Sequence, residues 1–288
     1  MKSTLFLRDL TCIDHAKIDS YGQLSGGSYN LDVLVSGDVE EHEQVVVDFS
    51  KCKHLIKDLV DDFNSGFDHK CWVAHHKLIE LPNGNVKVET PYLKLEGPSH
   101  LFRVLNQDMT EEQNIQVYLT HHLQEIYPTI KVEVHLRPTG FYRGGDARIL
   151  FRYAHGLKRS SSCGCKRIAH GHLSFIELKT TDFANRNLVG CVLHDIQSYI
   201  RNVYFAFREN IITDSPGFVK IAYTCDAGDT YSLELSTDVH DVIVLETETT
   251  VENLVNWLVE KYRVQLENAG VTRVYMSEGL MKGAMVEV

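Results

Sequence analysis

An internal repeat at an offset of 140 residues constrains the fold of this chain more than any other feature. Three pairs of matching landmarks share that offset: His15 and His155, Thr110 and Thr250, and Val134 and Val274. The chain has 288 residues, which is room for two ordinary domains. The sequence therefore predicts two similar modules, residues 1–143 and 144–288, joined near the glycine pair Gly144 and Gly145.

Each module shows strand signals, then a helix, a hairpin, a second helix and a closing strand. Alternating apolar residues in SYNLDVLVSG and ARILFRYAH predict half-buried strands, whereas the apolar residues of KHLIKDLVDDF recur at helical spacing. The Asn83-Gly84 pair predicts a hairpin turn. Thr110 with Gln113, and Thr249 with Glu252, predict helix starts of the capping-box type. This order predicts an α+β fold in which helices cover one face of an antiparallel sheet.

Three histidines in the second module form a candidate metal site. His170 and His172 lie in an HGH segment at the head of a strand-like run, and alternate residues of a strand share one face. His155 ends an earlier strand-like run that can pair antiparallel with the first across a loop rich in serine and glycine. Three protein nitrogens with one open position are typical of catalytic zinc. The alternative is that these are ordinary hydrogen-bonded or exposed members of the chain's fifteen histidines.

The loop between these strands carries two cysteines and four cations. Cys163 and Cys165 are too close together for a CxxC zinc knuckle, and the nearby histidines favour a reactive thiol over a disulfide. Lys158, Arg159, Lys166 and Arg167 either form a solvated loop or hold a phosphorylated small molecule.

Composition excludes several classes of function. A formal net charge of -10 argues against nucleic acid or anionic lipid as the main partner. No apolar run reaches transmembrane length, and the apolar start is too short for a signal peptide. Seven cysteines without a repeating framework indicate reduced thiols. We therefore expect a cytoplasmic protein.

In combination these motifs resemble the 6-pyruvoyltetrahydropterin synthase and 6-carboxytetrahydropterin synthase family, which has the tunnelling fold (T-fold). The motifs that carry the resemblance are His155, Cys165, HGH at 170–172, VVVDF at 45–49, FDH at 67–69, TVEN at 250–253 and SEG at 277–279. The family's thiol lies four residues before the first histidine of HGH, whereas Cys165 lies five before it and Cys163 seven. The resemblance therefore favours Cys165 but leaves Cys163 open. It implies a tandem duplication of the T-fold module.

The family's motifs are divided between the two modules. Where the second module has AHGH, the first has SGGS (25–28), so His15 lacks partner ligands. Pro138 falls at the position of Glu278. Asp68-His69 has no counterpart in the second module. Since relatives in this family complete each active site with an Asp-His pair from a neighbouring subunit, the resemblance implies one composite site per chain, complemented within the chain or between chains.

The resemblance also implies a reaction and a role for each residue. Zinc held by three histidines would bind the hydroxylated side chain of 7,8-dihydroneopterin triphosphate, with a thiol as base, an Asp-His relay and a glutamate on the pterin ring. The residues in these roles are His155, His170 and His172 for zinc, Cys165, Asp68 and His69 for catalysis, and Glu278 for the pterin. We expect the product to be 6-carboxytetrahydropterin, an early intermediate toward queuosine and other 7-deazapurines. The first alternative is an enzyme that forms the 6-pyruvoyl product. The second alternative is a non-catalytic protein that binds a pterin or purine and carries structural zinc. We also expect a homo-oligomer, because T-folds close their sheet edges by assembly.

Overall fold

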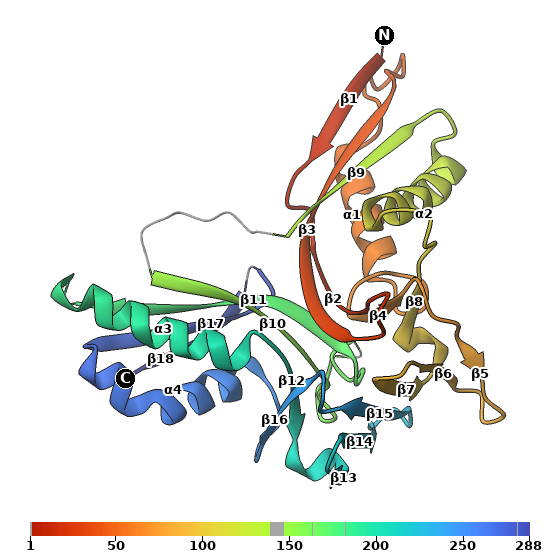
Figure 1. The fold of residues 1–288 in the computed structure, drawn as a ribbon. Helices are drawn as coiled ribbons and strands as arrows, with labels where there is room; N and C mark the ends of the chain where they lie inside the picture. Colours follow the sequence, from red (N-terminus) through yellow and green to blue (C-terminus); the bar gives the residue numbers. More distant parts are fainter. Residues whose placement is uncertain (1, 139–146, 163, 182, 281) are drawn as a thin grey trace.

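The computed structural model of the chain describes residues 2–138, 147–162, 164–181, 183–280 and 282–288. Within these residues it contains four α-helices and three six-stranded β-sheets (Figure 1). One sheet belongs to the N-terminal half (residues 2–138), one to the C-terminal half (residues 147–288), and the third combines strands of both. The predicted joint at Gly144 and Gly145 lies outside the described residues.

The sheet of the N-terminal half is built around the long strand β3. Its elements are β1 (Lys2–Leu7), β2 (Cys12–Ile18), β3 (Leu24–Asp38), α1 (Phe49–Asp61), β4 (Lys70–Val73), β8 (Phe102–Val104), α2 (Glu111–Ile126) and β9 (Lys131–Arg137). The first part of β3 pairs antiparallel with β2, and its second part lies between β1 and β9. β4 and β8 extend the sheet parallel to β2. Because strand side chains alternate, Leu31, Val33 and Val35 share the face that α1 and α2 cover.

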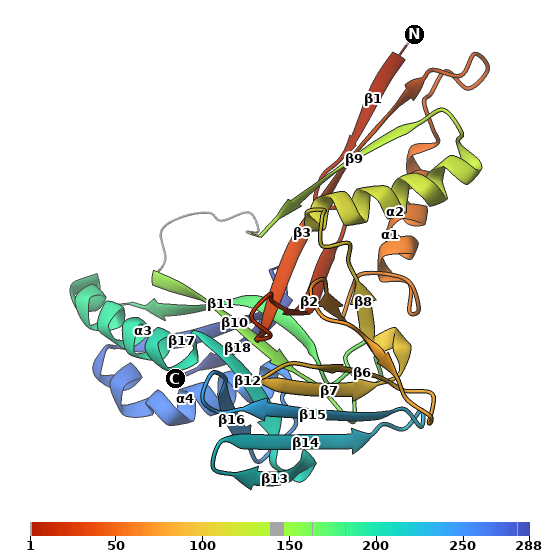
Figure 2. The same cartoon turned by 45° about the vertical axis from the view of Figure 1, so that its right-hand side comes forward.

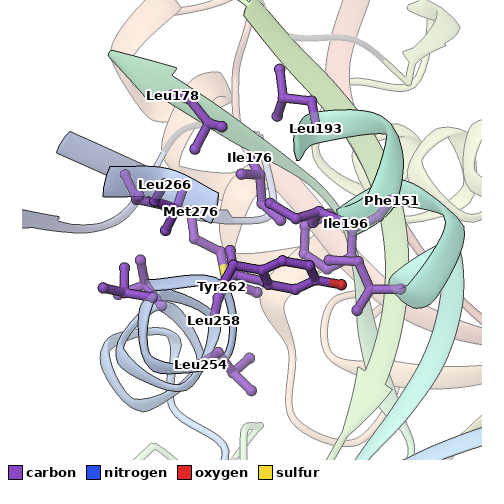
Figure 3. Close-up of a cluster of buried hydrophobic side chains, with 14 of the residues drawn as sticks. Phe151, Ile176, Leu178, Leu193, Ile196, Leu254, Leu258, Tyr262, Leu266 and Met276 are labelled. Carbon is purple, nitrogen blue, oxygen red and sulfur yellow. The ribbon is translucent and has the colours of Figure 1, made fainter. Parts of the chain in front are cut away.

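The sheet of the C-terminal half has the order β16-β12-β10-β11-β17-β18. Its elements are β10 (Ala147–His155), β11 (His170–Thr180), α3 (Arg186–Ile200), β12 (Asn202–Phe207), β16 (Asp241–Leu245), α4 (Val251–Asn268), β17 (Val271–Glu278) and β18 (Lys282–Glu287), with a short helical turn, η2 (Phe183–Asn185), before α3. Figure 3 shows α4 and α3 burying Leu258, Ile196 and their neighbours against Ile176 and Met276 of the sheet. Each such side chain contributes about 1.5–3 kcal/mol when fully buried.

The two halves repeat one topology. β8-β4-β2-β3-β9 and β16-β12-β10-β11-β17 follow the same spatial order, and corresponding pairs run in the same relative directions. In each half, three neighbouring strands run parallel to one another at one end of this order, and each of the next two strands runs antiparallel to the strand before it. The antiparallel sheet predicted from the sequence is therefore a mixed sheet in each half.

The helix starts follow from local hydrogen bonds. Thr110 and Gln113 form the predicted capping box of α2. The predicted pairing of Thr249 with Glu252 is wrong by one residue, because Thr250 is the N-cap of α4 and accepts a hydrogen bond from the backbone of Asn253. Thr249 is thereby left free to contact a histidine of the candidate site.

The third sheet joins the hairpins inserted in the two halves. Its strand order is β13-β14-β15-β7-β6-β5. The strands are β5 (Ile79–Glu80), β6 (Val86–Glu89), β7 (Leu93–Gly97), β13 (Ile211–Ser215), β14 (Phe218–Thr224) and β15 (Thr230–Ser236). Two short helical turns, η1 (Ser99–Leu101) and η3 (Arg208–Asn210), also belong to this part of the chain. β7 and β15 pair antiparallel across the halves (Figure 2). Gly84 has a φ of 84°, which suits the turn predicted at Asn83-Gly84.

A shared core holds the halves together. Residues of both sheets and of the third sheet form one buried cluster, which includes Ile18 and Val73 from the N-terminal half and Tyr204 and Leu233 from the C-terminal half. The halves therefore fold against each other rather than as separate bodies. No helix in the described part of the chain is long and apolar enough to cross a membrane.

Candidate active site

The pairing of β10 with β11 brings three histidines together. The strands are antiparallel as the sequence predicts, and their register places His155 opposite His170 and Tyr153 opposite His172. Cross-strand neighbours share a face, so the three imidazoles lie on the side of the sheet that α3 and α4 cover. All three are fully buried, at 0% exposure.

The imidazole nitrogens converge on one point. One nitrogen of each of His155, His170 and His172 lies within 4.8 Å of the other two, and Nε2 of His155 is 3.2 Å from Nε2 of His172. Nε2 of His170 is buried without a hydrogen-bond partner. Burial and neighbouring imidazoles lower the pKa of His155 and of His170 well below the ordinary value, so both rings are neutral and carry a free lone pair. Buried lone pairs without donors are costly, and a metal ion would satisfy them.

Each histidine also has an acceptor behind its other nitrogen. Nδ1 of His155 lies 2.9 Å from the carbonyl oxygen of Thr249, and Nδ1 of His170 lies 2.9 Å from that of Arg167. These two oxygens hold the proton on Nδ1 and direct Nε2 toward a metal. Nδ1 of His172 lies 3.2 Å from Oδ1 of Asp14, which is an ion-pair distance without an aligned hydrogen bond. The residues present therefore fit a metal ion bound by three imidazoles.

The N-terminal half places its Asp-His pair beside this cluster, within the same chain. Nδ1 of His69 lies 2.5 Å from Oδ2 of Asp68, and the ring centroid of His69 is 5.2 Å from that of His170. Ligand atoms of His69, Cys165 and His170 also lie within 4.8 Å of one another. His69 has a φ of 54°, an unusual conformation for a residue other than glycine.

Cys165 and His69 change each other's protonation. Burial raises the pKa of Cys165, but a hydrogen bond and charge attraction from His69 outweigh burial and leave the pKa below its ordinary value. Burial lowers the pKa of His69, while Asp68 and Cys165 raise it well above its ordinary value. The pair thus favours a thiolate beside an imidazolium. Cys163, the alternative thiol, lies outside the described residues.

The two halves meet at the glycine of HGH. A Cβ on Gly171 would lie 2.6 Å from Cα of Gly26 in β3, and a Cβ on Gly26 would lie 1.8 Å from the carbonyl oxygen of Tyr153. Ser28 accepts a hydrogen bond from the backbone of Leu173 at 3.0 Å. Only glycine at both positions allows β3 to approach β10 and β11 this closely.

Glu278 ends β17 near the same region. Its side chain is 15% exposed, and Oε2 lies 3.2 Å from Nζ of Lys282. Gly279 lies against the site, because a Cβ there would be 2.5 Å from Oδ1 of Asp14. A cavity of about 320 Å³ adjoins this strand end, with Ser277 and Lys282 among its lining residues.

The four cations of the loop do not share one role. Arg167 is 2% exposed and donates to the carbonyl oxygens of Phe63 at 2.7 Å and His69 at 3.0 Å, so its expected contact with solvent or phosphate is wrong. Burial and the charge of Arg167 lower the pKa of the neighbouring Lys70 to about 7. Arg159 is exposed and pairs with Glu209 at 2.5 Å. Arg167 thus holds the backbone that carries His69.

The ladder register corrects one equivalence expected from the sequence. The SGGS segment (25–28) was aligned so that Gly26 and Ser28 replaced the two histidines of HGH. In the structure His15 pairs with Gly27, and Ile13 pairs with Tyr29. Gly27 and Tyr29 therefore occupy the positions of His170 and His172, because a shift of one residue would turn the side chains to the opposite face.

Sequence reasoning missed Asp14 and Thr249 as partners of the histidines. Thr249 was assigned to the helix cap, which in fact begins one residue later. Asp14 directly precedes His15, and an acidic residue at a buried strand position is the signal that could have found it.

Comparison with known proteins finds one matching family. The family described as 6-pyruvoyl tetrahydropterin synthase matches residues 146–288. A search of curated proteins found no match. Similar solved structures include a catalytic-residue variant of Plasmodium vivax 6-pyruvoyltetrahydropterin synthase, with 17% identity, a TM-score of 0.39, and coverage of 49% of this chain and 94% of that chain. Another is Plasmodium falciparum 6-pyruvoyl tetrahydropterin synthase, with 18% identity, a TM-score of 0.38, and coverage of 48% and 91%.

The family match covers the strands that bear the three histidines, the loop that bears Cys165, and the strand end that bears Glu278. The C-terminal half of the chain, over residues 146–288, is a member of the 6-pyruvoyl tetrahydropterin synthase family.

Proposed function

We propose that the protein is a zinc-dependent lyase that acts on 7,8-dihydroneopterin triphosphate, with one composite active site per chain. The observation that carries the proposal is the meeting, in one chain, of three convergent imidazoles with a thiol and an Asp-His pair. The histidines and the thiol come from the half that belongs to the family, and the Asp-His pair comes from the other half.

The proposed metal is zinc, because three neutral imidazoles with outer hydrogen-bond acceptors are a typical donor set for catalytic zinc. His155, His170 and His172 would hold it. When bound, zinc would act as a Lewis acid on the hydroxyl groups of the substrate's side chain.

Cys165 is the proposed base for the proton on carbon next to those hydroxyl groups. His69 lowers the pKa of this thiol below its ordinary value, which favours the thiolate. Asp68 orients the imidazole of His69, which carries a proton at Nδ1 toward the carboxylate and can exchange a second proton at Nε2. This nitrogen is buried, and a ligand atom of His69 lies within 4.8 Å of ligand atoms of Cys165 and His170. The pair therefore relays protons to or from the substrate's side chain.

Glu278 is the proposed anchor of the pterin ring. A carboxylate accepts two hydrogen bonds from the amino-pyrimidinone edge, and Lys282 fixes one oxygen of this carboxylate at 3.2 Å. An anchor for the ring at Glu278 would leave the substrate's side chain free to extend toward the histidines.

The chain is proposed to be a tandem duplication, with modules 1–143 and 144–288. The repeated strand order of the two sheets supports this proposal. The outer edge of β18 is unpaired within the described chain, so a homo-oligomer that covers such edges is proposed as the working assembly. Six cysteines in the described residues are free thiols, which supports a reducing, cytoplasmic location.

The proposed products are 6-carboxy-5,6,7,8-tetrahydropterin, acetaldehyde and triphosphate, with one water consumed, on the route to queuosine and other 7-deazapurines. The second candidate is triphosphate elimination alone, which gives the 6-pyruvoyl product. The name of the matching family favours that candidate. Both begin with the same proton removal.

Incubation of the zinc-loaded protein with 7,8-dihydroneopterin triphosphate tests the proposal, with products identified by mass spectrometry. Triphosphate with acetaldehyde supports the carboxy product, and triphosphate without acetaldehyde supports the pyruvoyl product. Absence of turnover in a protein that binds the pterin and stoichiometric zinc would contradict the proposed lyase and favour a binding protein.

A further inference from the structure

Asp14 connects the Asp-His pair with the histidine cluster of the composite site. It lies on β2, is 2% exposed, and directly precedes His15. Its backbone nitrogen donates to Oδ1 of Asp68 at 2.8 Å, and its carbonyl oxygen accepts from the backbone nitrogen of His69 at 2.6 Å. Its carboxylate faces Nδ1 of His172 at 3.2 Å. One residue of the N-terminal half therefore contacts both the Asp-His pair and a candidate metal ligand.

The surroundings hold this carboxylate in place. Ser28 donates its hydroxyl hydrogen to Oδ1. The backbone at Gly279 approaches the same oxygen so closely that a Cβ would lie 2.5 Å away. Cys12 lies 3.8 Å from that oxygen through its sulfur atom. A carboxylate enclosed on these sides has little freedom to turn away from His172.

A fixed carboxylate behind an imidazole has a known physical effect on metal binding. Oδ1 of Asp14 acts on His172 as an ion-pair partner at 3.2 Å without an aligned hydrogen bond, so its charge favours the proton on Nδ1 and increases the basicity of Nε2. Its negative charge also favours a cation nearby. His155 and His170 have only neutral carbonyl or hydroxyl oxygens behind them, so His172 is the one of these three ligands that receives a carboxylate among the described contacts.

We propose that Asp14 is a positioning residue that orients His172 and raises the affinity of the site for zinc. The half that has lost its own metal ligands thus contributes to the metal site of the other half. The inference rests on the metal site of the proposed function and not on its reaction.

The test compares three variants of the full chain. Asp14→Asn keeps the size of the side chain and removes its charge, and Asp14→Ala removes both. Asp32→Asn is the matched control, since Asp32 is also a paired carboxylate of the same sheet, is held by Arg137 at 2.8 Å, and lies opposite His135 rather than against any of the three candidate ligands. Zinc affinity is measured by competition with a chromophoric chelator, and folding is checked by near-UV circular dichroism of the metal-free proteins.

We expect zinc affinity to fall about 10-fold in Asp14→Asn and toward 100-fold in Asp14→Ala, with no change in Asp32→Asn. Cobalt(II) bound in place of zinc supplies a second measurement, because its visible spectrum reports ligand geometry. A changed cobalt spectrum in Asp14→Asn is expected, whereas a purely structural role would leave the spectrum of the bound metal as in the wild type.

Wild-type affinity in both Asp14 variants would overturn the inference, as would an equal loss in Asp32→Asn. Failure of the wild type to bind zinc would overturn both the inference and the proposed metal site. Tight zinc binding that depends on Asp14, without turnover of the pterin triphosphate, would sustain the inference and reject the proposed reaction.

Discussion

His15 and His155 occupy equivalent places in the two halves, and their surroundings differ completely. His155 faces His170 across the strand pair and directs Nε2 toward His172 at 3.2 Å. His15 faces Gly27, and its ring stacks on Trp72 with the ring centroids 3.8 Å apart. A Cβ on Gly27 would lie 2.7 Å from the ring of His15, so the imidazole covers the place where a second ligand would stand. The same strand position thus holds a candidate metal ligand in one half and an aromatic core residue in the other.

The difference shows what a metal site requires beyond a histidine. Without ligands on the neighbouring strand, a buried imidazole packs as an apolar ring, and burial lowers the pKa of His15 to about 4. The N-terminal half instead carries Asp68-His69 and places this pair beside the histidine cluster of the C-terminal half. On the proposed function, each half would be incomplete as a catalyst without the other.

Replacing each of the two equivalent histidines by phenylalanine should give the largest difference in zinc content and turnover between the two halves. His155→Phe removes one of three nitrogen donors, so we expect loss of stoichiometric zinc and of detectable turnover. His15→Phe keeps an aromatic ring against Trp72 and should retain wild-type zinc content. Metal content after dialysis, measured by inductively coupled plasma mass spectrometry, checks both variants. Equal zinc loss in the two proteins would refute the contrast between the halves.

Substitution of the candidate thiols sharpens the contrast within the C-terminal half. Cys165→Ser should lower kcat by about 10²- to 10⁴-fold, because serine is a far weaker base than the thiolate that His69 stabilises. Zinc content should not change. Cys163→Ser is the control and should retain activity. Steady-state kinetics measure kcat of both variants. A loss of kcat in Cys163→Ser but not in Cys165→Ser would assign the base to Cys163.

Removing the guanidinium of Arg167 tests how the C-terminal half holds the Asp-His pair. Arg167→Met leaves the carbonyl oxygens of Phe63 and His69 without this donor, so we expect a loss of about 2–4 kcal/mol in unfolding free energy. A fall in kcat with unchanged zinc content should accompany it. Urea unfolding measures the stability.

Arg159→Met is the control for this substitution, since Arg159 lies on the same loop and forms an exposed pair with Glu209. Its effect on stability should stay below about 1 kcal/mol. Equal effects of the two substitutions would contradict a specific role for Arg167.

Much of this architecture follows from sequence pattern. The strand pairing of His155 with HGH, the hairpin at Asn83-Gly84 and the cap at Thr110 are local features, in which spacing and turn chemistry determine the structure. The repeat predicts equivalent strands, and both sheets have the same order. Periodicity cannot show that β2, β4 and β8 run parallel, because strand direction depends on how connections cross the sheet.

The contacts between the halves could not be predicted in the same way. A basic loop looks the same in sequence whether its arginine meets solvent or, as for Arg167, a set of carbonyl oxygens from another half. The roles of Asp14 and Gly26 depend on the close approach of β2 and β3 to β11. Alignment by offset also missed the register that places Gly27 opposite His15. These features depend on tertiary packing, which no single segment encodes.

The pH dependence of stability offers the smallest expected effect and tests the buried state of His15 directly. Its pKa is about 4 in the folded protein against 6.5 for an ordinary histidine, so between these values the unfolded chain binds more protons than the folded chain. Stability therefore falls as the pH decreases from 6.5 toward 4, by about 2–3 kcal/mol at pH 4.5 from this residue. His15→Phe removes this contribution, while all other titrating groups remain. Urea unfolding of both metal-free proteins at about pH 7 and pH 4.5 measures the difference. If both proteins lose the same stability on acidification, His15 does not titrate as a buried imidazole, and the packing contrast with His155 fails.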